Sequence, residues 1–170
     1  MPKDAVCAEI GVFKGDFTRE ILRVTEPREL HLIDPWEQLG ERYEHVWFEG
    51  MGETRPAGAR KQVERLVDRH PEARVHIGTS QDVIASFPDE YFDWVYLDSS
   101  HDYEQTVEEL ELLRRKVKPL GIIAGHDWFE NPGHQFHGVY RAVNEFCEGH
   151  GWELFDTDIF DQWAIRPRDR

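Results

Sequence analysis

The chain has 170 residues, of which 34 are acidic and 20 are basic, so its formal net charge at pH 7 is −14. A chain of this length is expected to form one domain, over residues 1–170, with a core of its own. Nucleic acids and anionic membranes require a local surplus of Lys and Arg, so the acidic balance argues against both as partners. No stretch approaches the roughly 20 apolar residues of a membrane span, and no signal-peptide core follows Met1. We therefore expect a cytoplasmic protein.

Short apolar runs alternate with amphipathic segments along the chain, a pattern typical of βαβ units and a mostly parallel sheet. The pattern predicts seven strands, at residues 5–10, 30–34, 74–77, 91–98, 120–125, 152–155 and 162–165. It predicts helices at residues 16–24, 59–70, 81–87, 103–117 and 139–147. The segment 91–98 is almost continuously apolar, which indicates a central strand, and the last two strands are expected to form a hairpin. The acids of residues 108–111 are interpreted as a solvated helix face.

The first predicted strand ends in a Gly-x-x-x-Gly turn, formed by Gly11 and Gly15, that leads into a helix. Glycines let the backbone approach a ligand closely and leave free N–H groups at a helix N-terminus. The spacing is not G-x-G-x-x-G, which disfavours a nicotinamide cofactor. Asp34 nevertheless follows Gly11 by 23 positions, where an acid that binds a ribose is expected. The alternative is a tight strand-to-helix connection without a ligand.

Polar residues also follow the third, fourth and fifth predicted strands. They are Gly78, Thr79, Ser80, Gln81 and Asp82, then Asp98, Ser99, Ser100 and His101, and then His126 and Asp127. Together with Glu9, the glycine turn and Asp34, this series resembles the class I S-adenosylmethionine-dependent methyltransferases from about residue 5 to the end of the chain. The branch it is most similar to is that of the metal-dependent, catechol O-methyltransferase-like O-methyltransferases and related small bacterial methyltransferases.

This resemblance implies a fold and a cofactor. The fold is a three-layer α/β/α sandwich with a seven-stranded, mostly parallel Rossmann-like sheet and a reversed C-terminal strand. In the family the turn after the first strand cradles the methionine part of S-adenosylmethionine, the acid after the second strand binds the ribose, and a pair after the third strand lines the adenine pocket. The residues at these positions are Gly11 and Gly15, Asp34, and Ser80 and Gln81, with Glu9 supporting the turn. The alternative for Ser80 is a helix cap.

The resemblance also implies a divalent cation such as Mg²⁺, held at the positions of Asp98, His126 and Asp127. A bound cation lowers the pKa of an acceptor hydroxyl and orients its oxygen. His126 stands where the family has an acid, which makes Mg²⁺ less suited and Mn²⁺, Fe²⁺ or Zn²⁺ better suited. The alternative is that Asp98 and Asp127 cap strand ends and hold His101.

His101 stands where the family places a lysine base, three residues after the first metal ligand. An imidazole with an unperturbed pKa of about 6.5 suits proton removal near neutral pH. The resulting hypothesis is methyl transfer to a hydroxyl of a small molecule such as a sugar, a phenol or a secondary-metabolite core, with His101 and Asp98 as catalytic residues. The alternatives are a methyltransferase-fold protein of a hydroxylase or tailoring system, a non-catalytic subunit that binds a protein partner, and an NAD-dependent enzyme.

Family members usually carry helices before the first strand that cover the cofactor, whereas here the first strand begins almost at Met1. We expect the aromatic segment 36–51, with Trp47 and Phe48, to act as a lid. A homodimer partner that closes the site and a plain surface loop are the alternatives. The acceptor pocket is expected near an aromatic cluster after the fifth strand, for which packing is the competing interpretation: Trp128, Phe129, His134, Phe136 and His137.

Overall fold

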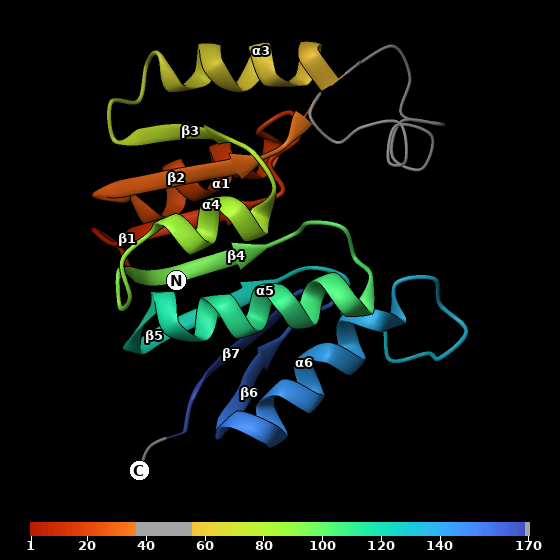
Figure 1. Ribbon diagram of the computed structural model, residues 1–170. Coiled ribbons are helices and arrows are strands. Elements are labelled where there is room, and N and C mark those ends of the chain that lie inside the picture. The colour runs from red at the N-terminus through yellow and green to blue at the C-terminus, as the bar shows by residue number, and fades with distance from the viewer. Residues whose placement is uncertain (37–55, 169–170) are drawn as a thin grey trace.

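The computed structural model describes residues 1–36 and 56–168, and a seven-stranded sheet lies at the centre of this part of the chain (Figure 1). The strands are β1 Val6–Ile10, β2 Glu29–Asp34, β3 Ala73–Ile77, β4 Phe92–Leu97, β5 Val117–Gly125, β6 Trp152–Thr157 and β7 Trp163–Pro167. Their order across the sheet is β3-β2-β1-β4-β5-β7-β6. Strands β1 to β5 pair in parallel, whereas β7 runs antiparallel to β5 and β6. The predicted sheet with a reversed C-terminal strand is confirmed, as is the hairpin of β6 and β7.

Helices cover both faces of the sheet and make it the middle of three layers (Figure 1). Helices α1 and α3 pack on one face, and α4, α5 and α6 pack on the other. Their bounds are α1 Asp16–Thr25, α3 Pro56–Val67, α4 Ser80–Ser86, α5 Tyr103–Lys116 and α6 His137–His150. The predicted α/β/α sandwich is therefore the observed architecture.

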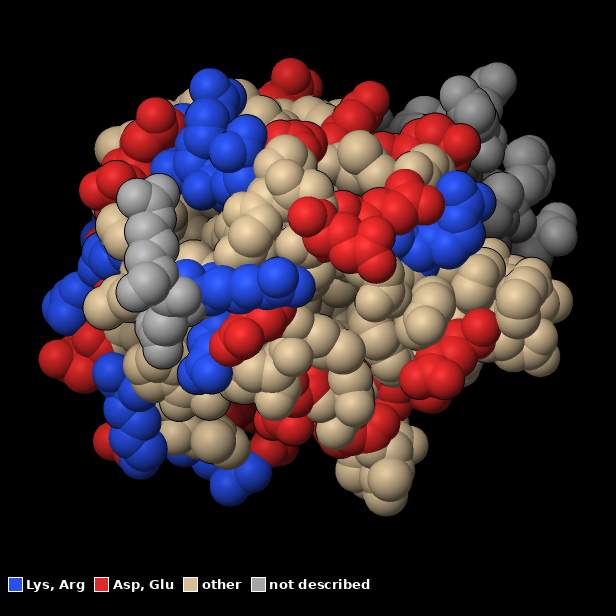
Figure 2. Space-filling model, turned by 90° about the horizontal axis from the view of Figure 1, so that it is seen from below, with Lys and Arg blue, Asp and Glu red and all other residues tan. Residues whose placement is uncertain are grey.

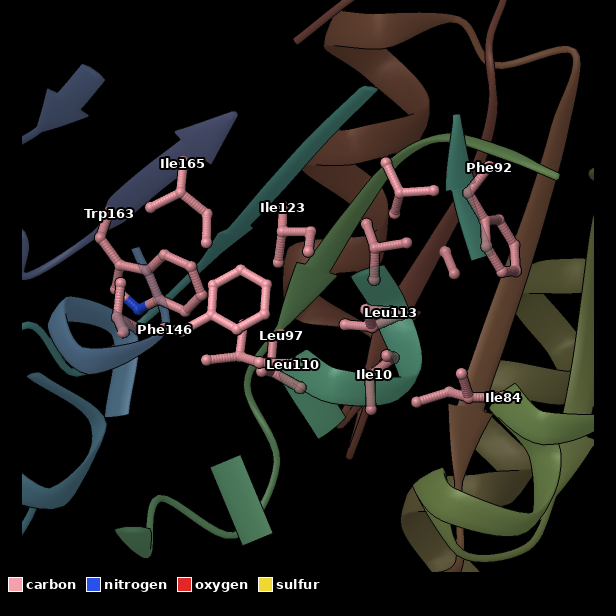
Figure 3. Close-up of a cluster of buried hydrophobic side chains, with 14 of the residues drawn as sticks. Ile10, Ile84, Phe92, Leu97, Leu110, Leu113, Ile123, Phe146, Trp163 and Ile165 are labelled. Carbon is pink, nitrogen blue, oxygen red and sulfur yellow. The ribbon is translucent and has the colours of Figure 1, made fainter. Parts of the chain in front are cut away.

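Two hydrophobic clusters, one on each face of the sheet, form the core. Strand β1 is buried along its whole length because alternate side chains enter opposite clusters, as Cys7 and Ala8 do. Figure 3 shows the larger cluster, in which Leu110 and Leu113 of α5 meet Leu97 of β4. Full burial of one such side chain contributes about 1.5–3 kcal/mol. The central position predicted for residues 91–98 is confirmed, since β4 lies between β1 and β5.

Strand β5 begins at Val117 rather than at Leu120, where the apolar pattern placed its start. The pairing of β4 with β5 is irregular here, because Phe92 faces Val117 whereas Trp94 faces Ile122. A Cβ on Gly121 would lie 2.8 Å from the carbonyl oxygen of Asp93, so the close approach requires glycine. A bulge of this kind interrupts the alternation on which strand prediction depends.

The strand order creates a crevice at one edge of the sheet. The chain adds β2 and β3 on one side of β1, and β4 and β5 on the other side. In open α/β sheets, ligands bind beyond the carboxyl ends of the strands at such a reversal. The fold therefore places the binding site beyond the ends of β1 and β4.

The charges on the surface are mixed. Figure 2 shows that on the face seen from below, Lys and Arg gather on the left of the view, with acidic side chains lying among them. Within the described residues, no helix combines the length and the apolar character that crossing a bilayer requires.

Candidate functional site

A cavity of about 480 Å³ opens beyond the carboxyl ends of β1, β2 and β4. Its size lies within the range of about 300–1,000 Å³ that is usual for small-molecule sites. Gly15, His126 and Asp127 are not among the described residues that line it. Seven of the predicted site residues do line it, namely Glu9, Gly11, Asp34, Ser80, Gln81, Asp98 and His101.

The turn after β1 depends on its two glycines. Gly11 has a φ of +86°, and a Cβ at this position would lie 1.9 Å from the carbonyl oxygen of Asp98. Any side chain there would collide with backbone, so the floor of the cavity requires glycine. Gly15 has a φ of +74°, and a Cβ there would lie 3.2 Å from Val63 of α3. Gly15 therefore shapes the turn and its packing against α3.

Asp34, at the end of β2, holds this turn in place. Its Oδ2 accepts hydrogen bonds from the backbone N–H groups of Val12 and Phe13, each at 2.9 Å. Its Oδ1 accepts the N–H of Trp36 at 2.7 Å. The carboxylate thus links the ends of β1 and β2, in addition to the ribose contact predicted for it.

Glu9 is a buried carboxyl group at the wall of the cavity, with 1 % of its surface exposed. Its Oε2 accepts a hydrogen bond from Thr18 Oγ1 at 2.5 Å. Burial raises its pKa to about 8, the hydrogen bond opposes this shift, and the charges of Asp98 and Asp34 add to it. Glu9 is therefore mostly uncharged at pH 7, and the other acidic residues that line the cavity are Asp16, Asp34 and Asp98. Ionised carboxylates in this wall favour a cationic ligand.

Ser80 and Gln81 lie in the first turn of α4, at the cavity wall. Ser80 Oγ donates to Gln81 Oε1 at 3.0 Å, and Gln81 Nε2 donates to Glu108 Oε2 at 3.2 Å. The interpretation of Ser80 as the helix cap is wrong, because Thr79 is the N-cap and its hydroxyl accepts the N–H of Asp82. Ser80 therefore does not cap the helix, and its side chain lines the cavity.

Helix α5 carries a buried acid that the sequence did not reveal. Glu109 is fully buried, so the interpretation of residues 108–111 as a solvated face is wrong at this position. Its Oε2 accepts from Ser99 Oγ at 2.7 Å, and its Oε1 accepts from Gln105 Nε2 at 3.0 Å. Burial raises its pKa, and these donors oppose the shift.

Beyond β4 and β5 the structure brings His101 together with two aspartates. His101 Nδ1 contacts Asp127 Oδ2 and lies 3.7 Å from Asp98 Oδ1. One ligand atom from each of these three residues lies within 4.8 Å of the others. His126 Nδ1 lies 3.2 Å from Asp127 Oδ1, but in the described part of the chain His126 is not a member of this group. The observed trio thus contains His101 where the predicted metal set contains His126.

The pKa values of the two aspartates in this group are shifted in opposite directions, upward for Asp98 and downward for Asp127. Burial raises the pKa of Asp98, and the neighbouring histidines oppose the rise. Burial also acts to raise the pKa of Asp127, but hydrogen bonds from His101 and His126 outweigh it and hold that pKa well below its usual range. The hydrogen bond to Asp127 in turn raises the pKa of His126. Asp127 is therefore ionised at neutral pH and orients the His101 ring through Nδ1, which makes Nε2 its basic nitrogen.

Four of the eight non-glycine residues with a positive φ in the described part of the chain lie around the site, and the other four are Asp4, Glu26, Glu90 and Asp161. His101 and Asp127 have φ values of +61° and +65°, and Phe13 and Trp36 at the cavity have +49° and +40°. Residues other than glycine rarely adopt this left-handed conformation, which costs of the order of 1–3 kcal/mol and is found at functional sites. The strain supports the assignment of this edge as the site.

The aromatic cluster after β5 divides between the core and the site. The ring centroid of Phe136 lies 4.9 Å from that of His101, which places Phe136 beside the histidine. Phe129 and His134 stack with centroids 3.6 Å apart, and His137 Nδ1 lies 2.9 Å from the carbonyl oxygen of Phe129. Trp128 is buried in the larger core cluster, in line with the packing interpretation.

The predicted lid falls largely outside the described residues. Within them, Trp36 is 2 % exposed, and its indole Nε1 donates to the carbonyl oxygen of Phe13 at 2.9 Å. Residues 37–51, with Trp47 and Phe48, lie in the part of the chain that is not described. The lid and the homodimer therefore stay predictions.

Three supporting residues escaped the sequence analysis. Gln105 and Glu109 are four residues apart on α5, and this spacing on one helix face was an available signal. Trp163 of β7 donates its indole N–H to the carbonyl oxygen of His126 at 2.8 Å. No local sequence motif predicts this contact.

Residues 8–128 match a family described as a methyltransferase domain, and the chain belongs to this family. A search of the curated proteins finds no match to the sequence.

Solved structures share the fold. A protein from Corynebacterium glutamicum is 11 % identical with a TM-score of 0.70, over 96 % of this chain and 73 % of that one. A SAM-dependent methyltransferase from Aquifex aeolicus is 16 % identical with a TM-score of 0.63, over 96 % of this chain and 81 % of that one. Spermidine synthase from Thermotoga maritima is 18 % identical with a TM-score of 0.59, over 96 % of this chain and 52 % of that one. Identities this low show the fold alone, and one fold serves several reactions.

Proposed function

We propose that the protein transfers a methyl group from S-adenosylmethionine to a hydroxyl of a small molecule, with His101 as the general base. The contact of His101 with Asp127, next to Asp98 and at a cavity of cofactor size, carries the proposal. S-adenosylmethionine supplies a methyl group on a positively charged sulfur. Asp34 and Asp98 line the cavity and suit that charge, and the glycine turn admits a ligand close to the backbone.

The residues of this chain would manage the proton. His101 Nε2 takes the proton of the acceptor hydroxyl as its oxygen forms a bond to the methyl carbon and the carbon–sulfur bond breaks. The electron pair of that bond stays on sulfur, which leaves S-adenosylhomocysteine as a neutral product. Asp127, ionised and in contact with Nδ1, stabilises the imidazolium that forms. Phe136, packed against the ring, limits its movement.

A divalent cation is the second component of the proposal. Two carboxylates and an imidazole are a suitable donor set for such an ion, and Asp98 and Asp127 would be its ligands, with either His126 or His101 as the third. A bound cation would lower the pKa of the acceptor hydroxyl. With His126 as the third ligand, His101 keeps its role as base. With His101 as the third ligand, the ion would lower the pKa of the acceptor hydroxyl, and the proton would pass to water instead of to His101.

Thermal unfolding with S-adenosylhomocysteine, with and without Mg²⁺ or Mn²⁺, tests the cofactor and the cation separately. Ligand at 100 times its Kd adds about 2.7 kcal/mol, which raises the midpoint of a protein of this size by roughly 5 to 10 °C. A further rise with a metal ion, lost in Asp98→Asn, would support the cation. No shift under any condition would contradict the proposal and leave a binding subunit as the alternative.

Methyl transfer to a panel of phenols, catechols and sugars then tests the base. His101→Ala should keep the shift with S-adenosylhomocysteine and lose about 10²- to 10⁴-fold in kcat, whereas His150→Ala, at the far end of α6, should lose nothing. Full activity of His101→Ala would exclude His101 as the base. Bound iron with oxygen-dependent turnover would favour the hydroxylase alternative instead.

A further inference from the structure

Glu109 is a buried acid without a role in the proton transfer proposed above. It is a fully buried residue of α5, and Leu110 and Leu113 of the same helix already anchor the helix to the sheet. A buried carboxylate costs free energy relative to an apolar side chain of similar size, so packing alone does not account for it. The groups that it binds therefore carry the explanation.

The carboxylate of Glu109 joins three segments of the cavity wall. Ser99, just after β4, donates to Oε2 at 2.7 Å, and Gln105, in the first turns of α5, donates to Oε1 at 3.0 Å. The same Gln105 amide donates to Ser80 Oγ, at the start of α4, at 3.4 Å. Ser80, Ser99 and Gln105 all line the cavity, whereas Glu109 lies behind them.

We propose that Glu109 is a positioning residue for the cofactor, which fixes Ser99, Gln105 and, through Gln105, Ser80 in the orientation that meets the adenosine end of the ligand. The inference rests on the proposed function. A fully buried acceptor can be satisfied only by its neighbours, so each donor is held in one rotamer. Because the donors also face the cavity, water can satisfy them when the carboxylate is removed, and the fold does not depend on it. The affinity for the ligand, in contrast, depends on the Glu109 carboxylate.

The test compares Glu109→Gln and Glu109→Leu with Glu104→Gln, an exposed acid on the same helix. Titration calorimetry at a temperature well below the unfolding midpoint gives the Kd for S-adenosylhomocysteine and for 5′-methylthioadenosine, which lacks the amino-acid end. We expect Glu109→Leu to weaken both ligands at least tenfold, Glu109→Gln to weaken both by a smaller factor, and Glu104→Gln to bind as the wild type does. The midpoint of Glu109→Leu without ligand should be unchanged or higher.

Other outcomes would overturn the inference. Wild-type affinity in both Glu109 variants, or a lower midpoint with unchanged Kd, would make Glu109 a purely structural residue. If Glu109→Leu does not fold, Glu109→Gln decides alone. The combination with Ser99→Ala adds an independent measurement, because loss through a shared contact should be less than additive. Absence of binding by the wild type would instead reject the proposed function itself.

Discussion

Glu9 makes the stability of the protein depend on pH. Its pKa is about 8 in the folded chain and 4.5 in the absence of its environment, so between these values the folded state holds a proton that the unfolded state lacks. The stabilisation is complete below pH 4.5 and is lost as the pH rises through 8, by up to about 1.4 kcal/mol per pH unit. Glu9→Gln should remove this contribution. Urea unfolding from pH 5 to 8 should show the wild type losing stability relative to Glu9→Gln, and parallel curves would contradict the assignment.

Replacement of Gly11 should cause a steric clash at the same turn. Gly11→Ala places a methyl group 1.9 Å from the carbonyl oxygen of Asp98, so the ends of β1 and β4 must separate. We expect a loss of several kcal/mol in stability and no shift with S-adenosylhomocysteine. Gly58→Ala is the matched control, because a Cβ there has no neighbour within 4 Å among the described residues and α3 should gain up to about 1 kcal/mol. Chemical unfolding of both variants checks the pair.

The sequence predicted the site residues that lie at strand ends within a motif, but it did not predict the supporting residues that are distant from these motifs in the sequence. The glycine turn and Asp34 lie at strand ends that the apolar runs mark. The sequence analysis named the contact of His101 with Asp127 as the alternative to a metal site, but the left-handed backbone at both residues leaves no signal in the hydrophobic periodicity. Glu109 has the same residue type as its exposed neighbours, and only the fold distinguishes it.

Helix α5 joins the two halves of the site, since it begins just after His101 and carries Gln105 and Glu109. Asp102 is its N-cap, and its Oδ1 accepts the N–H of Gln105 at 2.8 Å. Asp102→Ala should cost about 1 kcal/mol and should weaken binding of S-adenosylhomocysteine because the turn that holds Gln105 frays. Asp68→Ala, at an exposed position, serves as control. An Asp102→Ala variant with unchanged urea midpoint and affinity would show that the cap is not needed.

The sequence predicted the order and the type of the helices and strands correctly, but it predicted their boundaries less accurately. All the predicted strands and helices have a counterpart in the structure, because amphipathic period and buried apolar runs reflect the layers directly. The start of β5 was missed because Pro119 and Gly121 suggested a break, and they lie in a bulge of the strand instead. Turn residues and bulge residues are the same types, so composition does not separate them.

The whole molecule carries a net charge of −14, which opposes its compact state by self-repulsion. Raising NaCl from 0.01 to 0.1 M shortens the Debye length from about 30 Å to about 10 Å. We therefore expect the thermal midpoint to rise over this range, and the protein to pass through a heparin column without retention. KCl should act as NaCl does. A falling midpoint would mean that exposed ion pairs outweigh the repulsion.

The reversed strand β7 determines when the site comes into existence during synthesis. Trp163 pairs with Gly125 and binds the carbonyl oxygen of His126, and the carbonyl oxygen of Asp161 accepts the N–H of Trp128. A ribosome that has translated Asp127 must add another 36 residues before Trp163 exists. At about 5–20 residues per second this takes roughly 2 to 7 s. For that interval the nascent chain contains His101 and Asp127 but lacks the strand that pairs with the end of β5, so we expect the pair to be assembled only after β7 has been synthesised.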